Sequence, residues 1–274
     1  MNNDITLVTN FFDIGRGKLP SEVRGLVLPH FQHRSTDVYF DYFRELAPLE
    51  NDMVVYTSKE FSDRIYNIRK DFGLESKTTI VEMVSYCFPG FEDVLEKIKT
   101  IQNSPSYYSK VDKPHFVEYW WPEYILIQYM KVFYVNDAIE KSLIKNDLTA
   151  WIDFGYCRNK TTLPESKKWT YNFTRDKMHL FSLKPIEPQR PIDDIIYRGD
   201  VYIMGCHIVG GTEKWKLFKN YVIQAMEELL KHDLIHYDQT LYLIALLMHP
   251  EEFELRYIHE SDWFVVLKYL NDAP

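Results

Sequence analysis

The octapeptide WIDFGYCR, residues 151–158, places a carboxylate directly after an apolar segment. Asp153 ends that segment, and Gly155 and Arg158 follow it. A lone buried carboxylate is costly unless another group pairs with it, so a ligand or a cation is an expected partner. A strand-end aspartate can hold a divalent cation or a ribose hydroxyl, and a nearby arginine can face a phosphate. The alternative is a turn aspartate that binds its own backbone. We favour the ligand-binding interpretation.

Two more charged residues follow the first apolar segment of the chain, in the stretch TNFFDIGRG. Asp13 and Arg16 lie just beyond the expected strand, where contact with a nucleotide base or phosphate competes with ordinary turn chemistry. The dinucleotide-binding fingerprint is incomplete, because Gly15 and Gly17 are followed by Pro20 where a third glycine is needed. The P-loop, zinc-peptidase and serine-hydrolase motifs are also missing from the sequence.

The second half of the chain contributes two further candidate groups. In GCHIVGGTEKW, Gly210 and Gly211 would let backbone amides approach a ligand, and the start of the following helix favours anions. A plain strand-to-helix turn explains the same glycines equally well. In HYDQ, Asp238 stands where a helix N-cap is expected, so capping competes with a catalytic or sugar-binding role.

The composition restricts the classes of partner. The 274 residues are 46% hydrophobic and 16% aromatic, which is enough for a sizeable core. The net charge of -8 argues against a nucleic-acid partner and against broad docking to anionic lipid, so at most peripheral membrane association is expected. Cys87, Cys157 and Cys206 are odd in number and widely spaced, which favours reduced thiols. Reduced thiols, together with an N-terminus that is unlike a signal peptide, predict a cytoplasmic protein.

Strands and helices alternate in the first half of the chain. This alternation predicts an open, mostly parallel and twisted α/β sheet flanked by helices. In such sheets ligands bind outside the carboxyl ends of the strands, and Asp153 stands at such an end. Apolar runs predict buried strands at 5–12, 53–58, 78–84 and 148–153, and amphipathic segments predict helices at 37–47, 59–72, 91–103 and 122–144.

The chain changes character after residue 158. Residues 159–200 are polar and contain several prolines, which predicts a small mixed C-terminal extension with antiparallel strands. Beyond it, the pattern predicts a strand at 200–211 and a helix that Thr212 caps and that runs to about residue 231. A further helix from Asp238 to a point before Pro250 and a possible edge strand at 253–258 complete the expected elements.

Taken in order, five segments resemble the HtrL/YibB family, a group expected to be glycosyltransferases. They are TNFFDIGRG, FVEYWWPEYILIQYMKVFYVNDAI, WIDFGYCR, MGCHIVGG and DQTLYLIALLMHPEEFELRY, and they cover about residues 5–258. The resemblance implies one GT-A-like domain over residues 1–274, with a nucleotide-binding half at 1–158 and an acceptor or sugar half at 159–274. The implied reaction moves a sugar from a nucleotide-sugar donor, expected to be a UDP-sugar, to a hydroxyl of a glycan or lipid-linked acceptor, as in polysaccharide biosynthesis.

The resemblance also implies roles for individual residues. Asp153 matches the acidic metal-binding motif of such folds, although Gly155 stands where a second aspartate is common. A divalent cation, Mn²⁺ or Mg²⁺, would need further ligands, for which His259 and Asp238 are candidates. Asp238 is the candidate base, and Asp153 is the other catalytic candidate. The residues expected around the nucleotide-sugar, with Lys131 at the diphosphate, are Thr9, Phe11, Asp13, Arg16, Lys131, Asp153, Gly155, Arg158, Gly210, Gly211 and Gln239.

Two alternative functions remain open. A non-catalytic nucleotide-sugar or glycan-binding protein on the same fold is compatible with a motif that has a single aspartate. The second alternative is a methyltransferase in which an acidic residue at a strand end binds a ribose hydroxyl. Such an enzyme needs a glycine-rich first loop, which is not convincingly present here.

Overall fold

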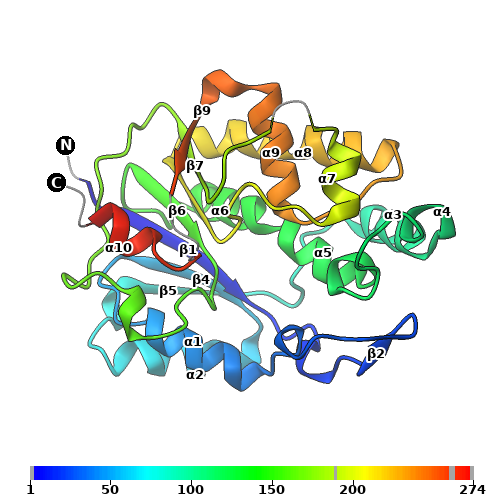
Figure 1. Cartoon of the computed structure of the whole chain (residues 1–274). Coiled ribbons are helices and arrows are strands. Elements are labelled where there is room, and N and C mark those ends of the chain that lie inside the picture. The colour runs from blue at the N-terminus through cyan, green and yellow to red at the C-terminus, as the bar shows by residue number, and fades with distance from the viewer. Residues whose placement is uncertain (1–2, 188–189, 259–262, 272–274) are drawn as a thin grey trace.

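A seven-stranded mixed sheet forms the centre of the computed structural model, which describes residues 3–187, 190–258 and 263–271 (Figure 1). The strand order is β5-β4-β1-β6-β8-β7-β9. A separate hairpin pairs β2 (Glu22–Val23) with β3 (Leu26–Val27). The strands of the large sheet are β1 (Ile5–Phe11), β4 (Met53–Thr57), β5 (Thr78–Glu82), β6 (Leu148–Ile152), β7 (Met178–Ser182), β8 (His207–Gly211) and β9 (Phe253–Tyr257).

The strands of the first half run parallel to one another. β1 pairs in parallel with β4 and with β6, and β4 pairs in parallel with β5, which confirms the predicted α/β sheet. Every residue of β4 and β6 is buried, as expected for parallel strands with helices on both faces. Because β1 and β6 are parallel neighbours, their carboxyl ends at Phe11 and Ile152 meet at the same edge of the sheet.

Helices cover both faces of the sheet (Figure 1). The apolar sides of α1, α2 and α10 pack on one face, and those of α3, α5, α6, α8 and α9 pack on the other. No helix among the described residues has the length and apolar character needed to cross a membrane. The helices are α1 (Thr36–Leu46), α2 (Lys59–Lys70), α3 (Glu92–Asn103), α4 (Pro105–Tyr108), α5 (Pro122–Tyr129), α6 (Lys131–Glu140), α7 (Ile192–Arg198), α8 (Lys214–Lys231), α9 (Asp238–Met248) and α10 (Val266–Asn271).

Two helix predictions need correction. The single helix expected at 122–144 is divided at Met130, so that Lys131 becomes the first residue of α6. Around this junction the amide of Phe133 donates to the Met130 carbonyl, a tighter i→i−3 bond than an α-helix uses. Thr212 does not cap α8, because its hydroxyl donates to the Asn146 carbonyl. The helix expected at 37–47 is confirmed as α1, and the Ser35 hydroxyl caps it by accepting a hydrogen bond from the Val38 amide.

The second-half strands join the same sheet. β8 lies antiparallel between β6 and β7, and β9 pairs in parallel with β7 at the edge of the sheet. The expected edge strand and the antiparallel character are therefore confirmed. The strand expected at 200–211 begins only at His207, and β7, within the polar segment 159–200, was not predicted. Since β8 starts opposite Ile152, the residues just before β8 lie beside the end of β6.

Candidate functional site

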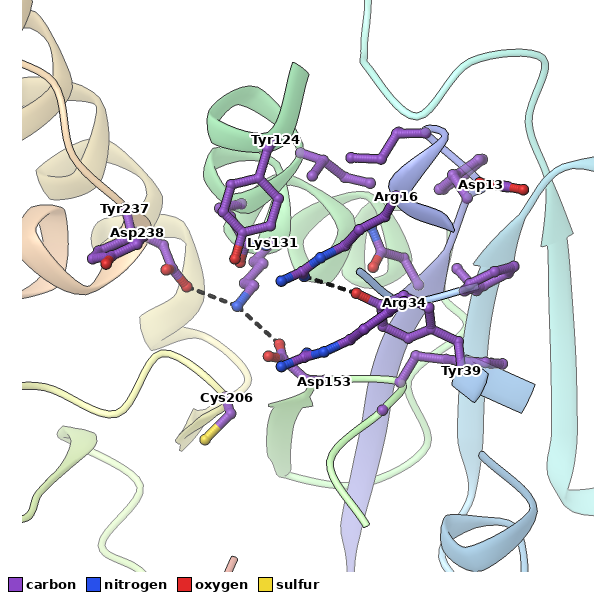
Figure 2. Close-up of a pocket in the computed structure, with 18 of the residues that line it drawn as sticks. Asp13, Arg16, Arg34, Tyr39, Tyr124, Lys131, Asp153, Cys206, Tyr237 and Asp238 are labelled. Atoms are coloured by element: carbon purple, nitrogen blue, oxygen red, sulfur yellow. Dashed lines mark hydrogen bonds and ion pairs between the residues drawn. The ribbon is translucent and has the colours of Figure 1, made fainter. Parts of the chain in front are cut away.

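A pocket with a volume of ≈ 460 Å³ lies at the carboxyl ends of β1 and β6. This is the edge at which ligands of open α/β sheets bind. Figure 2 shows labelled side chains around it from the segment that follows β1, from α1, α5 and α6, and from the start of α9. The pocket is lined by Asn10, Phe11, Phe12, Asp13, Ile14, Arg16, Phe31, Arg34, Thr36, Tyr39, Tyr124, Ile127, Gln128, Lys131, Asp153, Phe154, Gly155, Arg158, Val201, Cys206, Tyr237, Asp238, Gln239, Trp263 and Phe264.

Lys131 joins two carboxylates on one side of the pocket (Figure 2). Its Nζ lies 2.8 Å from Oδ1 of Asp153 and 2.8 Å from Oδ2 of Asp238. The Asp238 side chain is 3% exposed, whereas that of Asp153 is 37% exposed. Burial alone would lower the pKa of Lys131, but Asp153 and Asp238 raise it above its usual range. The ammonium therefore stays charged, and of the two carboxylates that line the pocket Asp153 is the more exposed.

Neighbouring backbone and ring groups hold this cluster in place. Asp153 Oδ1 accepts a hydrogen bond of 2.8 Å from the Trp151 indole, and its amide donates to the Cys206 carbonyl. Lys131 Nζ donates to the carbonyl of Gly205 at 3.0 Å. A Cβ at position 205 would lie 2.5 Å from Asp238 Oδ2, so only glycine lets this loop approach the carboxylate. The cluster is thus fixed from β6, α6, α9 and the segment before β8.

Arg16 and Arg34 enter the pocket from the segment between β1 and α1. Arg16 donates from Nε to the Gln32 carbonyl at 3.0 Å and from a terminal nitrogen to the Tyr39 hydroxyl at 2.8 Å. Its guanidinium also lies 4.9 Å from the centre of the Tyr124 ring. Burial, followed by the like charge of Arg16, lowers the pKa of Arg34. The two cations therefore stand close enough to repel each other.

Arg158 adds a third guanidinium to the pocket that Arg16 and Arg34 line. It lies 4.1 Å from the centre of the Tyr42 ring and 5.2 Å from that of Phe264. Its Nε is buried and has no hydrogen-bond partner among the described residues. No ion pair with a carboxylate involves Arg16, Arg34 or Arg158 across the described part of the chain. These arginines instead donate hydrogen bonds to carbonyls and a hydroxyl or lie over aromatic rings. Clustered cations without acidic partners are an arrangement that an anionic ligand would stabilise.

The structure brings most of the residues predicted from the sequence together. Phe11, Asp13, Arg16, Lys131, Asp153, Gly155, Arg158, Asp238 and Gln239 all line the pocket. The turn interpretation of Asp13 has direct support, since its carboxylate accepts hydrogen bonds from the Gly15 amide and the Thr36 hydroxyl. Lys131 was expected to reach the diphosphate of a ligand. In the structure its ammonium instead contacts two carboxylates.

Three predicted positions lie away from the pocket. Thr9 is fully buried inside β1 and is not a lining residue. Gly210 and Gly211 belong to β8 and pair with Thr149 and Leu148, at the opposite end of β6 from Asp153, so the predicted glycine turn beside the sugar was wrong. A Cβ at Gly211 would lie 2.0 Å from the Arg175 carbonyl oxygen, which explains the glycine by close packing. His259 lies outside the described residues.

The capping role considered for Asp238 does not hold. Tyr237 occupies the N-cap position of α9, and Asp238 is the first helical residue. Burial raises the pKa of Asp238, while Lys131 opposes that shift. The position of this carboxylate is thus explained by its contact with the lysine and not by the helix end alone.

Several pocket residues had no motif that would have identified them. Arg34, Tyr39 and Tyr124 lie in or beside segments interpreted only as loop or amphipathic helix. In the sequence they share only a cationic or aromatic side chain near the end of an element that flanks β1 or β6. Gly205 lay within the strand expected at 200–211 and stands two residues before β8, but its importance depends on the approach of Asp238.

The side chains do not offer the donor set expected for a divalent cation. Within the described ranges no group of three or more His, Cys, Asp and Glu residues is placed to hold a metal ion. Asp153 and Asp238 both contact the Lys131 ammonium, and Gly155 brings no side chain. Mg²⁺ and Ca²⁺ sites need several oxygen ligands around the ion. The described residues therefore do not fit the expected metal.

Two solved structures are similar to the chain, both with low TM-scores. Mouse xyloside xylosyltransferase 1 in its apo form matches with a TM-score of 0.43 and 10% identity, covering 92% of this chain and 84% of that chain. The 4-diphosphocytidyl-2C-methyl-D-erythritolsynthase of Anaerococcus prevotii DSM 20548 matches with a TM-score of 0.38 and 12% identity, covering 96% and 91%. Similarity at this level does not bear on fold or function.

Similarity in sequence is much stronger. Protein HtrL of Escherichia coli (strain K12) is 34% identical over 269 residues, which cover 96% of this chain and 91% of that protein. The model of a family described as "Bacterial protein of unknown function (HtrL_YibB)" matches residues 3–271. This chain therefore belongs to the HtrL/YibB family.

Proposed function

We propose that this protein is a glycosyltransferase that transfers a sugar from a nucleotide-sugar donor, expected to be a UDP-sugar, to a hydroxyl of a glycan or lipid-linked acceptor. The observation that carries the proposal is that Arg16, Arg34 and Arg158, which form no ion pair with a carboxylate among the described residues, line the pocket together with the partly exposed Asp153. Such a site combines cations for a diphosphate with an acid for a hydroxyl, at the sheet edge where open α/β folds bind ligands.

The three guanidinium groups suit the diphosphate of the donor. Each can donate two parallel hydrogen bonds to phosphate oxygens, and none among the described residues is already neutralised by a carboxylate. As the donor reacts, the bond between the anomeric carbon and the phosphate oxygen breaks, and the electron pair stays on the diphosphate. The arginines would stabilise that developing charge, which is the kind of electrostatic contribution that lowers barriers most.

The acceptor hydroxyl must form the new bond to the anomeric carbon and lose its proton. In an inverting displacement a carboxylate takes this proton. We assign that role to Asp153, whose side chain is 37% exposed, and not to Asp238, whose side chain is 3% exposed. Asp238 would then act as a positioning residue that holds Lys131. The tyrosine and tryptophan side chains that line the pocket offer flat faces for a base or a sugar.

One observation favours a non-catalytic binding protein as the second candidate. Asp153 contacts the Lys131 ammonium at 2.8 Å, so this carboxylate already has an ion-pair partner in place of an acceptor hydroxyl. A protein that only holds a nucleotide-sugar needs the arginines but no proton acceptor. The two candidates therefore share a ligand and differ in turnover.

A binding panel followed by a turnover assay tests the proposal. Melting temperatures would be measured with UDP-sugars, GDP-sugars, CMP-sialic acid and S-adenosylmethionine, because a ligand that binds the folded state raises stability with concentration. We expect stabilisation by a UDP-sugar, and its loss in Arg34→Ala. The matched control is Arg44→Ala, whose side chain is 54% exposed and pairs with Asp71 at the surface.

The ligand that stabilises the chain would then be incubated with glycan acceptors, and released nucleoside diphosphate would be measured. Release that depends on Asp153 supports the enzyme. Tight binding without release of diphosphate across the acceptor panel supports the binding protein. If S-adenosylmethionine alone stabilises the chain, both candidates fail.

A further inference from the structure

Three oxygen atoms surround the Lys131 ammonium. Two are carboxylate oxygens of Asp153 and Asp238, each 2.8 Å from Nζ, and the third is the Gly205 carbonyl oxygen at 3.0 Å. They come from the end of β6, the start of α9 and the segment before β8. Figure 2 shows Nζ between the two carboxylates. Carboxylate and carbonyl oxygens are the atoms that bind Mg²⁺ and Ca²⁺ in proteins, but here two carboxylates and one carbonyl converge on an ammonium.

The distances and the burial match a lysine better than a metal ion. Oxygens bind Mg²⁺ at about 2.0–2.1 Å and Ca²⁺ at about 2.3–2.6 Å, whereas ammonium-to-carboxylate contacts are about 2.7–2.9 Å. Lys131 is 5% exposed, because it begins α6 beneath the sheet edge. A divalent ion would have to displace this buried ammonium and shorten all three contacts.

We propose that the Lys131 ammonium is the resident cation of this site and stands in place of a divalent metal, so that the chain binds nucleoside diphosphate without metal. This inference rests on the proposed function for the identity of the ligand. Lys131 neutralises the two carboxylates that would otherwise repel a diphosphate, and Arg16, Arg34 and Arg158 supply the positive charge that faces it.

The first test uses the unaltered protein. Calorimetry with UDP would be run in EDTA and again with Mn²⁺, and we expect the two affinities to agree within about twofold, which corresponds to negligible coupling between metal and nucleotide. UDP binding that occurs only with Mn²⁺ would overturn the proposal.

The second test removes the lysine and reads metal binding directly. In Lys131→Ala the two carboxylates and the Gly205 carbonyl face an empty volume, so we expect the variant to gain one Mn²⁺ per chain, seen as loss of the free-ion electron paramagnetic resonance signal. The gain should disappear in Lys131→Ala combined with Asp153→Asn. The matched control is Lys141→Ala, which removes the exposed lysine at the carboxyl end of α6 from its ion pair with Asp137.

The outcomes separate this inference from the proposed function. Stoichiometric Mn²⁺ binding by the unaltered chain that Asp153→Asn abolishes would overturn the inference, as would a folded Lys131→Ala chain that binds no Mn²⁺. If Lys131→Ala does not fold, the comparison of UDP binding in EDTA and in Mn²⁺ decides. If no nucleotide binds under any condition, the proposed function fails, while the Mn²⁺ measurements still report on the role of Lys131.

Discussion

Replacing Lys131 by methionine should destabilise the fold far more than the same change at Lys141. Lys131 begins α6 and Lys141 is the residue that caps its carboxyl end, and both form ion pairs, but the Lys131 side chain is 6% exposed and that of Lys141 is 51% exposed. Methionine keeps most of the stem volume, so the main loss is the charge. Without it, Asp238 is left buried and unpaired. Breaking a buried pair in this way costs about 3–5 kcal/mol, whereas an exposed pair within one helix contributes about 0.3–0.5 kcal/mol.

Urea unfolding followed by circular dichroism measures both free energies. For a chain of this size the Lys131→Met loss corresponds to a melting temperature lower by roughly 5–9 °C. Adding Asp238→Asn to Lys131→Met removes the unpaired charge and should restore roughly 1–3 kcal/mol, a coupling that a double-mutant cycle isolates. The reasoning is refuted if Lys131→Met lies within about 1 kcal/mol of the unaltered protein, the usual range of a surface change, or if the double variant is less stable than the single one.

Four further predictions concern the pocket and its support. Asp153→Asn should lower transfer roughly a hundredfold or more, measured as released diphosphate, with little change in melting temperature; full activity would remove Asp153 from the mechanism. Arg34→Ala should weaken UDP binding in calorimetry by about 1.5–3 kcal/mol, the range of a charged hydrogen bond, whereas Arg44→Ala should not; equal affinities would place Arg34 outside the diphosphate site. Gly205→Ala should lower the unfolding free energy by about 1–3 kcal/mol, since its Cβ would lie 2.5 Å from a carboxylate oxygen, and unchanged stability would contradict that crowding. Burial lowers the pKa of His207 to about 3 from the ordinary value of 6.5, so its contribution is complete above pH 6.5 and falls as the pH drops toward 3. Between pH 7 and 4.5 the unaltered protein should therefore lose about 2–3 kcal/mol more than His207→Phe in urea unfolding, and equal losses would exclude a buried neutral histidine.

The parallel half of the sheet could be predicted from the sequence because each of its strands is a local signal. β1, β4 and β6 are short apolar runs separated by amphipathic helices, and this alternation leaves few alternatives to a parallel sheet. The position of Asp153 at the pocket followed from the same rule, since it comes directly after β6. β7 was missed because its short run lies within a polar segment, where only pairing with β8 and β9 makes it a strand.

The roles of individual side chains depended on contacts that no local pattern contains. Asp238 was expected to cap a helix or act as a base, yet it binds Lys131, which comes from a distant part of the chain. Gly210 and Gly211 had the composition of a ligand-binding turn, but the antiparallel register of β8 carries them to the far end of the sheet. The sequence by itself determined the buried strands of the first half and the helices around them, because hydrophobic periodicity is a local property. Only the tertiary structure decided which charged groups meet, because that depends on strand order, on the direction of β8 and on the absence of a side chain at Gly205.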